Sequence, residues 1–71
     1  MGNYRQAIAD YTEAIRLNPS HVGAFNSRGV AHFRMGNLDL AIADYEAALR
    51  LDPNHTLARR NLEIARQRRG R

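Results

Sequence analysis

The side chains best suited to chemistry are three imidazoles and two pairs of acids. The imidazoles belong to His21, His32 and His55, and no two of them are four residues apart, the spacing that sets two metal ligands on one helical face. The chain has no cysteine, so neither a thiolate metal site nor a cysteine nucleophile is available. We therefore expect no metal and no other cofactor.

The acidic pairs are Asp10 with Glu13 and Asp44 with Glu46, and paired carboxylates can act as general acid and base. However, Asp10 and Asp44 hold the same position in two copies of the motif Ala-Ile-Ala-Asp-Tyr. A catalytic centre normally has a single, asymmetric arrangement of groups. We therefore expect no catalytic residue and no enzymatic activity.

The two motif copies belong to a repeat with a period of 34 residues, because Met1-Gly2-Asn3 returns as Met35-Gly36-Asn37. Residues 1–21 and 35–55 are identical at 13 of 21 positions. A fixed period of this size is typical of stacked helical repeats.

Apolar residues recur at helical spacing within each copy. In the first copy they are Tyr4, Ala7, Ile8, Tyr11, Ala14 and Ile15, and the second copy has the same stripe one period later. The spacing predicts helices over residues 4–17 and 38–51, with a third over 21–35 and a fourth over 55–69. The turns between them are short, so neighbouring helices should pack antiparallel.

Polar residues, prolines and one glycine mark where these helices begin and end. Asn18-Pro19 and Asp52-Pro53 end the first and third helices, because proline disfavours a helical conformation in the residue before it. Gly36 suits a left-handed residue after the second predicted helix. N-caps are predicted at Asn3, Ser20, Asn37 and Asn54.

The positive charge of the chain is concentrated at one end. The formal net charge is +4, and residues 56–71 contain six arginines against Glu63 alone. No stretch approaches the roughly 18 apolar residues of a membrane span. A cytoplasmic location is the default expectation.

The chain resembles the tetratricopeptide repeat family. The residues that carry the resemblance are Phe25, Arg28-Gly29, His32, Ala41, Tyr45 and Pro53. The resemblance implies an all-α, right-handed helical-repeat fragment of about four antiparallel helices. Within a single domain over residues 1–71, residues 1–21 form the second helix of a partial repeat, residues 22–55 a full repeat, and residues 56–71 a C-terminal capping helix.

Three positions lead to specific packing expectations. Arg28 and His32 stand where the family usually has Leu and Tyr, so the helix that carries them should pack less tightly. Gly29 lies inside a helix, where glycine costs about 1 kcal/mol relative to alanine, and close approach of the neighbouring helix through Ala41 would offset that cost. In the fourth helix, Arg59 and Glu63 are spaced to form an ion pair.

The resemblance also implies a function, which is to bind a partner protein or peptide without catalysis on the concave face of the repeats. An apolar centre surrounded by arginines suits a peptide with acidic groups or a free C-terminus. The opposing interpretation is that Val30 and Phe33 only complete a core. The predicted peptide-binding residues are Asn26, Val30, Phe33, Arg34, Arg60, Asn61, Ile64 and Arg68.

Two alternatives remain. The chain begins halfway through a repeat, so we expect either an excerpt of a longer array or a homo-oligomer that covers the first helix. The predicted self-association residues are Tyr4, Ala7, Ile8, Tyr11 and Ala14. The second alternative is nucleic-acid contact through the arginine-rich end. We favour over it the interpretation that these arginines keep a terminal helix solvated.

Overall fold

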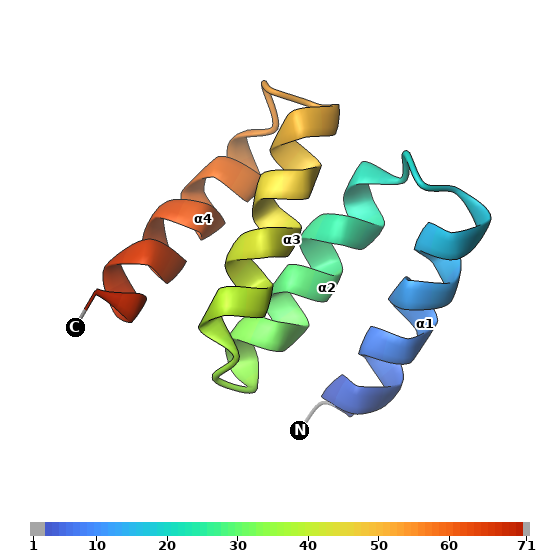
Figure 1. Ribbon diagram of the computed structural model, residues 1–71, viewed down its shortest axis with the longest axis horizontal. Helices are drawn as coiled ribbons and strands as arrows, with labels where there is room; N and C mark the ends of the chain where they lie inside the picture. Colours follow the sequence, from blue (N-terminus) through green and yellow to red (C-terminus); the bar gives the residue numbers. More distant parts are fainter. Residues whose placement is uncertain (1–2, 71) are drawn as a thin grey trace.

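The computed structural model describes residues 3–70, which form four helices. They are α1 (Tyr4–Leu17), α2 (Val22–Arg34), α3 (Leu38–Leu51) and α4 (Thr56–Arg69). The helices lie side by side with the chain reversing at each turn, and α1 and α4 form the two edges (Figure 1). The described residues contain no strand, so the prediction of an all-α helical-repeat fold is confirmed.

The predicted helix boundaries are accurate, but two of the predicted caps are wrong. The Asn3 side chain accepts a hydrogen bond from the Gln6 amide at 3.0 Å, as expected for an N-cap. Asn37 holds the cap position of α3 but makes no side-chain cap bond. Gly36 has a φ of +84°, so the left-handed residue after α2 is present.

Helices α2 and α4 are capped by histidines and not by Ser20 and Asn54. The Nδ1 atom of His21 accepts a hydrogen bond from the Ala24 amide at 3.0 Å. His55, one period later, uses the same atom to accept from the Ala58 amide at 3.1 Å. A neutral imidazole nitrogen reaches the third amide of the helix, so it replaces the oxygen acceptor that the sequence led us to expect.

The core lies around α3, because α3 packs against both α2 and α4. Its central cluster consists of Ala41, Ile42, Tyr45, Leu62 and Ala65. Helix α1 packs against α2 alone and has no buried residue. The hydrophobic stripe is therefore mostly buried in α3 and only partly buried in α1.

Gly29 permits a close approach between α2 and α3. A Cβ atom at Gly29 would lie 2.6 Å from Cε1 and 2.8 Å from Cδ1 of Tyr45, well inside van der Waals contact. The expectation of close packing is correct, but the neighbour is Tyr45 and not Ala41. The aromatic ring occupies the space that a larger side chain on α2 would need.

Among residues 3–70, no helix is long and apolar enough to cross a membrane.

Candidate functional site

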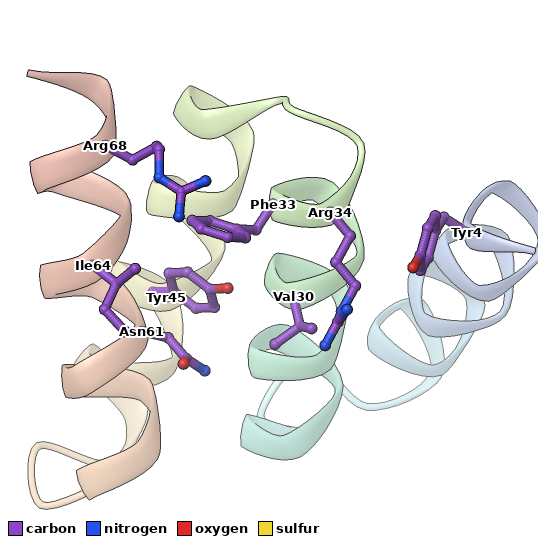
Figure 2. Close-up of a pocket in the computed structure, with 8 residues that line it drawn as sticks. All are labelled: Tyr4, Val30, Phe33, Arg34, Tyr45, Asn61, Ile64 and Arg68. Carbon is purple, nitrogen blue, oxygen red and sulfur yellow. The ribbon is translucent and has the colours of Figure 1, made fainter. Parts of the chain in front are cut away.

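A groove of about 430 Å³ lies over α3, between α2 and α4. Figure 2 shows the side chains of both helices pointing toward it, with Tyr4 of α1 at one end. Its lining residues are Tyr4, Val30, Phe33, Arg34, Tyr45, Asn61, Ile64 and Arg68. Six of the eight residues predicted for peptide binding are in this set.

The other two predicted residues, Asn26 and Arg60, lie outside the lining. Asn26 is only 7% exposed, and its Oδ1 accepts a hydrogen bond from Nδ2 of Asn61 at 3.2 Å. This bond joins α2 to α4 and orients the Asn61 amide beside the groove. Arg60 is exposed on α4, one residue before Asn61.

The groove has an apolar centre with two cationic side chains. Val30 and Phe33 are partly buried against the core cluster, whereas Ile64 is 42% exposed. The Arg68 guanidinium carbon lies 5.1 Å from the centre of the Phe33 ring, within cation–π range (Figure 2). Arg34 extends from α2 on the side facing Tyr4. Val30 and Phe33 thus support the core and line the groove at once, so the two interpretations left open by the sequence are compatible.

Tyr45 forms part of the groove floor. Its side chain is 2% exposed, and its hydroxyl points across the groove toward α2 (Figure 2). Burial and the nearby Asp44 carboxylate raise the pKa of Tyr45 to about 12, while Arg34 acts in the opposite direction. The phenol is therefore neutral at physiological pH and keeps its hydrogen-bond donor.

A second hollow of about 210 Å³ continues the groove between α1 and α2. Tyr4, Val30 and Arg34 line both hollows, which makes the surface continuous. Its lining residues are Asn3, Tyr4, Ala7, Tyr11, Ser27, Val30, Ala31 and Arg34. The repeat is visible in this surface, because Ser27, Val30 and Arg34 of α2 correspond to Asn61, Ile64 and Arg68 of α4, one period later.

The predicted self-association residues are divided by this arrangement. Tyr4, Ala7 and Tyr11 line the hollow beside α2, while Ile8 and Ala14 do not. All five are partly buried. Sequence reasoning assigned Tyr4 to self-association and gave Tyr45 no binding role, so it missed both as groove residues. For Tyr45 the available signal was its 34-residue equivalence to Tyr11, since each of the two lines one of the hollows.

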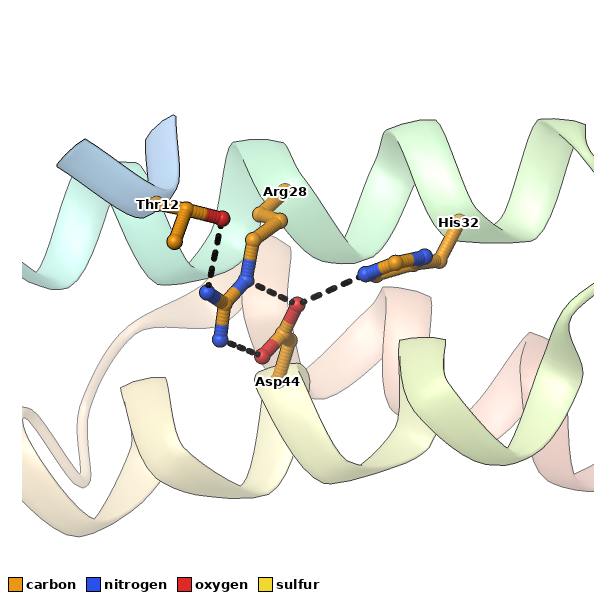
Figure 3. A network of polar contacts seen from close by, with 4 residues as sticks. All are labelled: Thr12, Arg28, His32 and Asp44. Carbon is orange, nitrogen blue, oxygen red and sulfur yellow. Dashed lines mark hydrogen bonds and ion pairs between the residues drawn. The ribbon is translucent and has the colours of Figure 1, made fainter. Parts of the chain in front are cut away.

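Away from the groove, Arg28 joins three helices through polar contacts (Figure 3). Its Nε and Nη2 atoms donate to the two carboxylate oxygens of Asp44 at 2.9 and 2.7 Å. Its Nη1 atom donates to the Thr12 hydroxyl of α1 at 3.2 Å. The bidentate bonds to Asp44 raise the pKa of Arg28 further, so it stays charged.

This network changes the expectation of looser packing at Arg28. The Asp44 side chain is 7% exposed and that of Arg28 is 20% exposed, so the ion pair is largely shielded from water. His32 is adjacent, with Nε2 3.8 Å from Asp44, and its buried Nδ1 has no hydrogen-bond partner among residues 3–70. Arg28 thus forms a specific cross-link, whereas looser packing at His32 stays a prediction.

Most arginines of α4 are engaged with the rest of the chain. Arg66 pairs with Glu46 and Arg69 pairs with Asp39, each at 3.1 Å. Arg59 donates to the Pro53 carbonyl, and no ion pair with Glu63 forms among the described residues, so that prediction is wrong. Three of the arginines that suggested nucleic-acid contact therefore make exposed contacts with α3 or the preceding turn.

A tetratricopeptide repeat family model matches residues 1–56, which include α1, α2, α3 and the turn that follows. No curated protein matches the chain.

Proposed function

Because the chain belongs to the tetratricopeptide repeat family, whose members generally mediate protein–protein interaction, we propose that it binds an extended peptide in the groove between α2 and α4. The family is typically a non-catalytic scaffold. The proposed role is to hold a partner protein without changing it covalently.

The observation that carries the proposal is the composition of the groove. Phe33 and Ile64 offer an apolar contact for one side chain of the ligand. Arg34 and Arg68 present guanidinium groups, which suit a carboxylate from an acidic residue or a free C-terminus. A volume of about 430 Å³ is within the range of roughly 300–1,000 Å³ found for ligand sites.

The polar groups of the groove suit an extended ligand backbone. The Tyr45 hydroxyl can donate to a peptide carbonyl, and the Asn61 amide can both donate and accept. Equivalent side chains on α2 and α4 are one period apart, so an extended chain lying across both helices would meet similar contacts in sequence. These features favour a peptide over a compact small molecule.

The test is selection from a display library of random peptides with free C-termini. We expect the selected sequences to combine one apolar residue with acidic residues or an essential C-terminal carboxylate. Reversing both groove charges, Arg34→Glu with Arg68→Glu, should weaken binding of a selected peptide by about a hundredfold, because two charge-assisted hydrogen bonds would be lost.

The matched control is Arg60→Glu, an identical substitution on α4 outside the groove lining. It should change affinity by less than about threefold, since exposed charges contribute little. Circular dichroism would verify that every variant keeps its helices. Equal loss of affinity in the control and the double variant would contradict the groove as the binding site.

The cytoplasmic location expected from the sequence stays a prediction.

A further inference from the structure

The outer side of α3 carries an exposed apolar stripe in addition to the side that forms the core. The stripe consists of Leu40, Ala43, Ala47 and Leu51, whose spacing of three and four residues sets them on one side of the helix. Leu40 and Leu51 are 53% and 42% exposed, Ala43 is exposed and Ala47 is partly buried. None of the four lines the groove or belongs to the core cluster. We call these four residues the outer stripe.

The way in which the helices stack leaves the outer stripe uncovered. Helix α3 uses its other side, with Ala41, Ile42 and Tyr45, to pack against α2 and α4. Within residues 3–70, α1 packs against α2 and not against α3, although α3 follows it by one period. A helix stacked one period beyond α3 would by the same geometry leave α3 untouched. The exposure of the outer stripe therefore follows from the position of α3 within the stack.

Two opposite charges lie beside the outer stripe, one near each end of α3. Asp39 and Arg50 are eleven residues apart, close to three full turns, so they flank the same edge of the stripe. Asp39 pairs with Arg69 at 3.1 Å, but its side chain is still 83% exposed. Arg50 is exposed and forms no ion pair within residues 3–70. This edge thus has an acid at one end and a base at the other.

We propose that the outer stripe binds the outer stripe of a second copy of the chain, with the two α3 helices antiparallel. This arrangement sets Leu40 of each copy against Leu51 of the other. The alanines lie in the middle, where small side chains let two helices approach closely. A two-fold axis makes each edge face the same edge of the other copy, so Asp39 of each copy meets Arg50 of the other. The surface complements itself in both polarity and charge, which identifies a second copy as its occupant.

Helix α1 carries the same positions of the repeat without this complementarity. Where α3 has a leucine and an alanine of the outer stripe, α1 has Gln6 and Glu13. The edge positions of α1 hold Arg5 and Arg16, so the same antiparallel pairing would set arginine against arginine. The repeat therefore does not require the outer stripe. The proposed contact differs from the self-association surface predicted on α1, and it goes beyond peptide binding in the groove.

The size of the contact sets the expected strength of the dimer. Helix α3 has 14 residues and is about 21 Å long. One pair of helices of this length buries less than the roughly 1,200 Å² at which stable interfaces begin. We therefore expect a weak dimer that forms at chain concentrations on the order of 0.1–1 mM. Sedimentation equilibrium of the full chain over about 10 μM to about 1 mM covers this range.

The apolar part of the contact is tested by giving α3 the residues of α1. The double variant Leu40→Gln with Ala47→Glu should weaken self-association at least about tenfold, because polar groups would be buried in an apolar contact. The matched control is Ile64→Gln in the groove, where the side chain is 42% exposed. It should leave self-association unchanged. Circular dichroism would verify that each variant keeps its helices.

A charge exchange tests the antiparallel arrangement. Asp39→Arg makes both ends of the edge basic, and Arg50→Asp makes both ends acidic, so each variant alone should be monomeric at concentrations where the unmodified chain dimerises. An equimolar mixture of the two variants should dimerise again, because each copy then meets the opposite sign at both ends. The control is Arg16→Asp, the same substitution one period earlier on α1, which should dimerise as the unmodified chain does.

Three outcomes would overturn the proposal. The first is an unmodified chain that stays monomeric up to about 1 mM, the upper end of the expected range. The second is a dimer that Tyr11→Asp dissociates but that Leu40→Gln with Ala47→Glu does not, because the copies would then meet through α1. The third is a mixture of the two charge variants that stays monomeric, because Asp39 and Arg50 would then not meet across the contact.

Discussion

Helices α1 and α3 share the motif Ala-Ile-Ala-Asp-Tyr but differ in the number of helices that cover them. α3 lies between α2 and α4, and five of its residues are buried. α1 contacts α2 alone and has no buried residue. Identical side chains therefore contribute different amounts to stability, because the hydrophobic effect depends on the surface that neighbours remove from water.

Removing the tyrosine from each helix tests this comparison with the largest expected effect. Tyr45→Ala should lower the free energy of unfolding by about 3–5 kcal/mol, because it leaves a cavity in the core. Tyr11→Ala should cost about 1 kcal/mol, because its ring is only partly buried. A domain of this size is marginally stable, so far-UV circular dichroism should show the Tyr45 variant largely unfolded and the Tyr11 variant folded. If the two variants lost equal free energy of unfolding, the Tyr11 side of α1 would have to be buried in solution.

Substituting the two aspartates provides a second test, in which the expected change in stability is intermediate. Asp44→Ala should destabilise the fold by about 2–3 kcal/mol, because it leaves the guanidinium of Arg28 largely shielded and without its carboxylate. Asp10→Ala should change stability by less than about 0.5 kcal/mol. Urea denaturation measures both values.

A double variant separates the ion pair from simple packing. Arg28→Leu combined with Asp44→Ala should recover most of the loss caused by Asp44→Ala alone, because no buried charge is left unpaired. The same double variant would remain as unstable as the single one if Arg28 acted mainly through its contact with Thr12.

Gly29 offers a smaller and more specific test of the contact between α2 and α3. Gly29→Ala gains about 1 kcal/mol of helix propensity but forces its Cβ into the Tyr45 ring, at a cost of about 1–3 kcal/mol. We expect a net loss of about 1 kcal/mol in thermal or urea denaturation. Glu63→Ala, the equivalent exposed position of α4, should be nearly neutral. A Gly29→Ala variant more stable than the parent chain would show that α3 shifts freely to make room.

The sequence predicted the helices well because its signals were local and redundant. The apolar spacing, the Pro residues after α1 and α3 and the repeat itself all indicated the same four elements. The histidine caps were missed because a capping imidazole has no strong sequence preference, whereas Ser20 and Asn54 do. Local preference was therefore a better guide to where a helix exists than to which side chain begins it.

The groove was less predictable because it depends on how helices meet. Six lining residues followed from the face of α2 and its copy on α4. Tyr45 could be recognised only as apolar, and its position on the groove floor depends on the packing around Gly29. The partner of Arg28 was also unpredictable, since Arg28 and Asp44 meet across two helices that the sequence does not place in register.

Alkaline pH tests the burial of the Tyr45 phenol without creating a cavity in the core. The unfolded chain should release the Tyr45 proton near the ordinary pKa of about 10, whereas the folded chain holds it to about 12. The unfolded state therefore binds fewer protons in this window, and stability should fall as pH rises from about 10 toward about 12. Tyr45→Phe should flatten this alkaline loss in urea denaturation. An equally steep loss in the Tyr45→Phe variant would assign the alkaline sensitivity to another group.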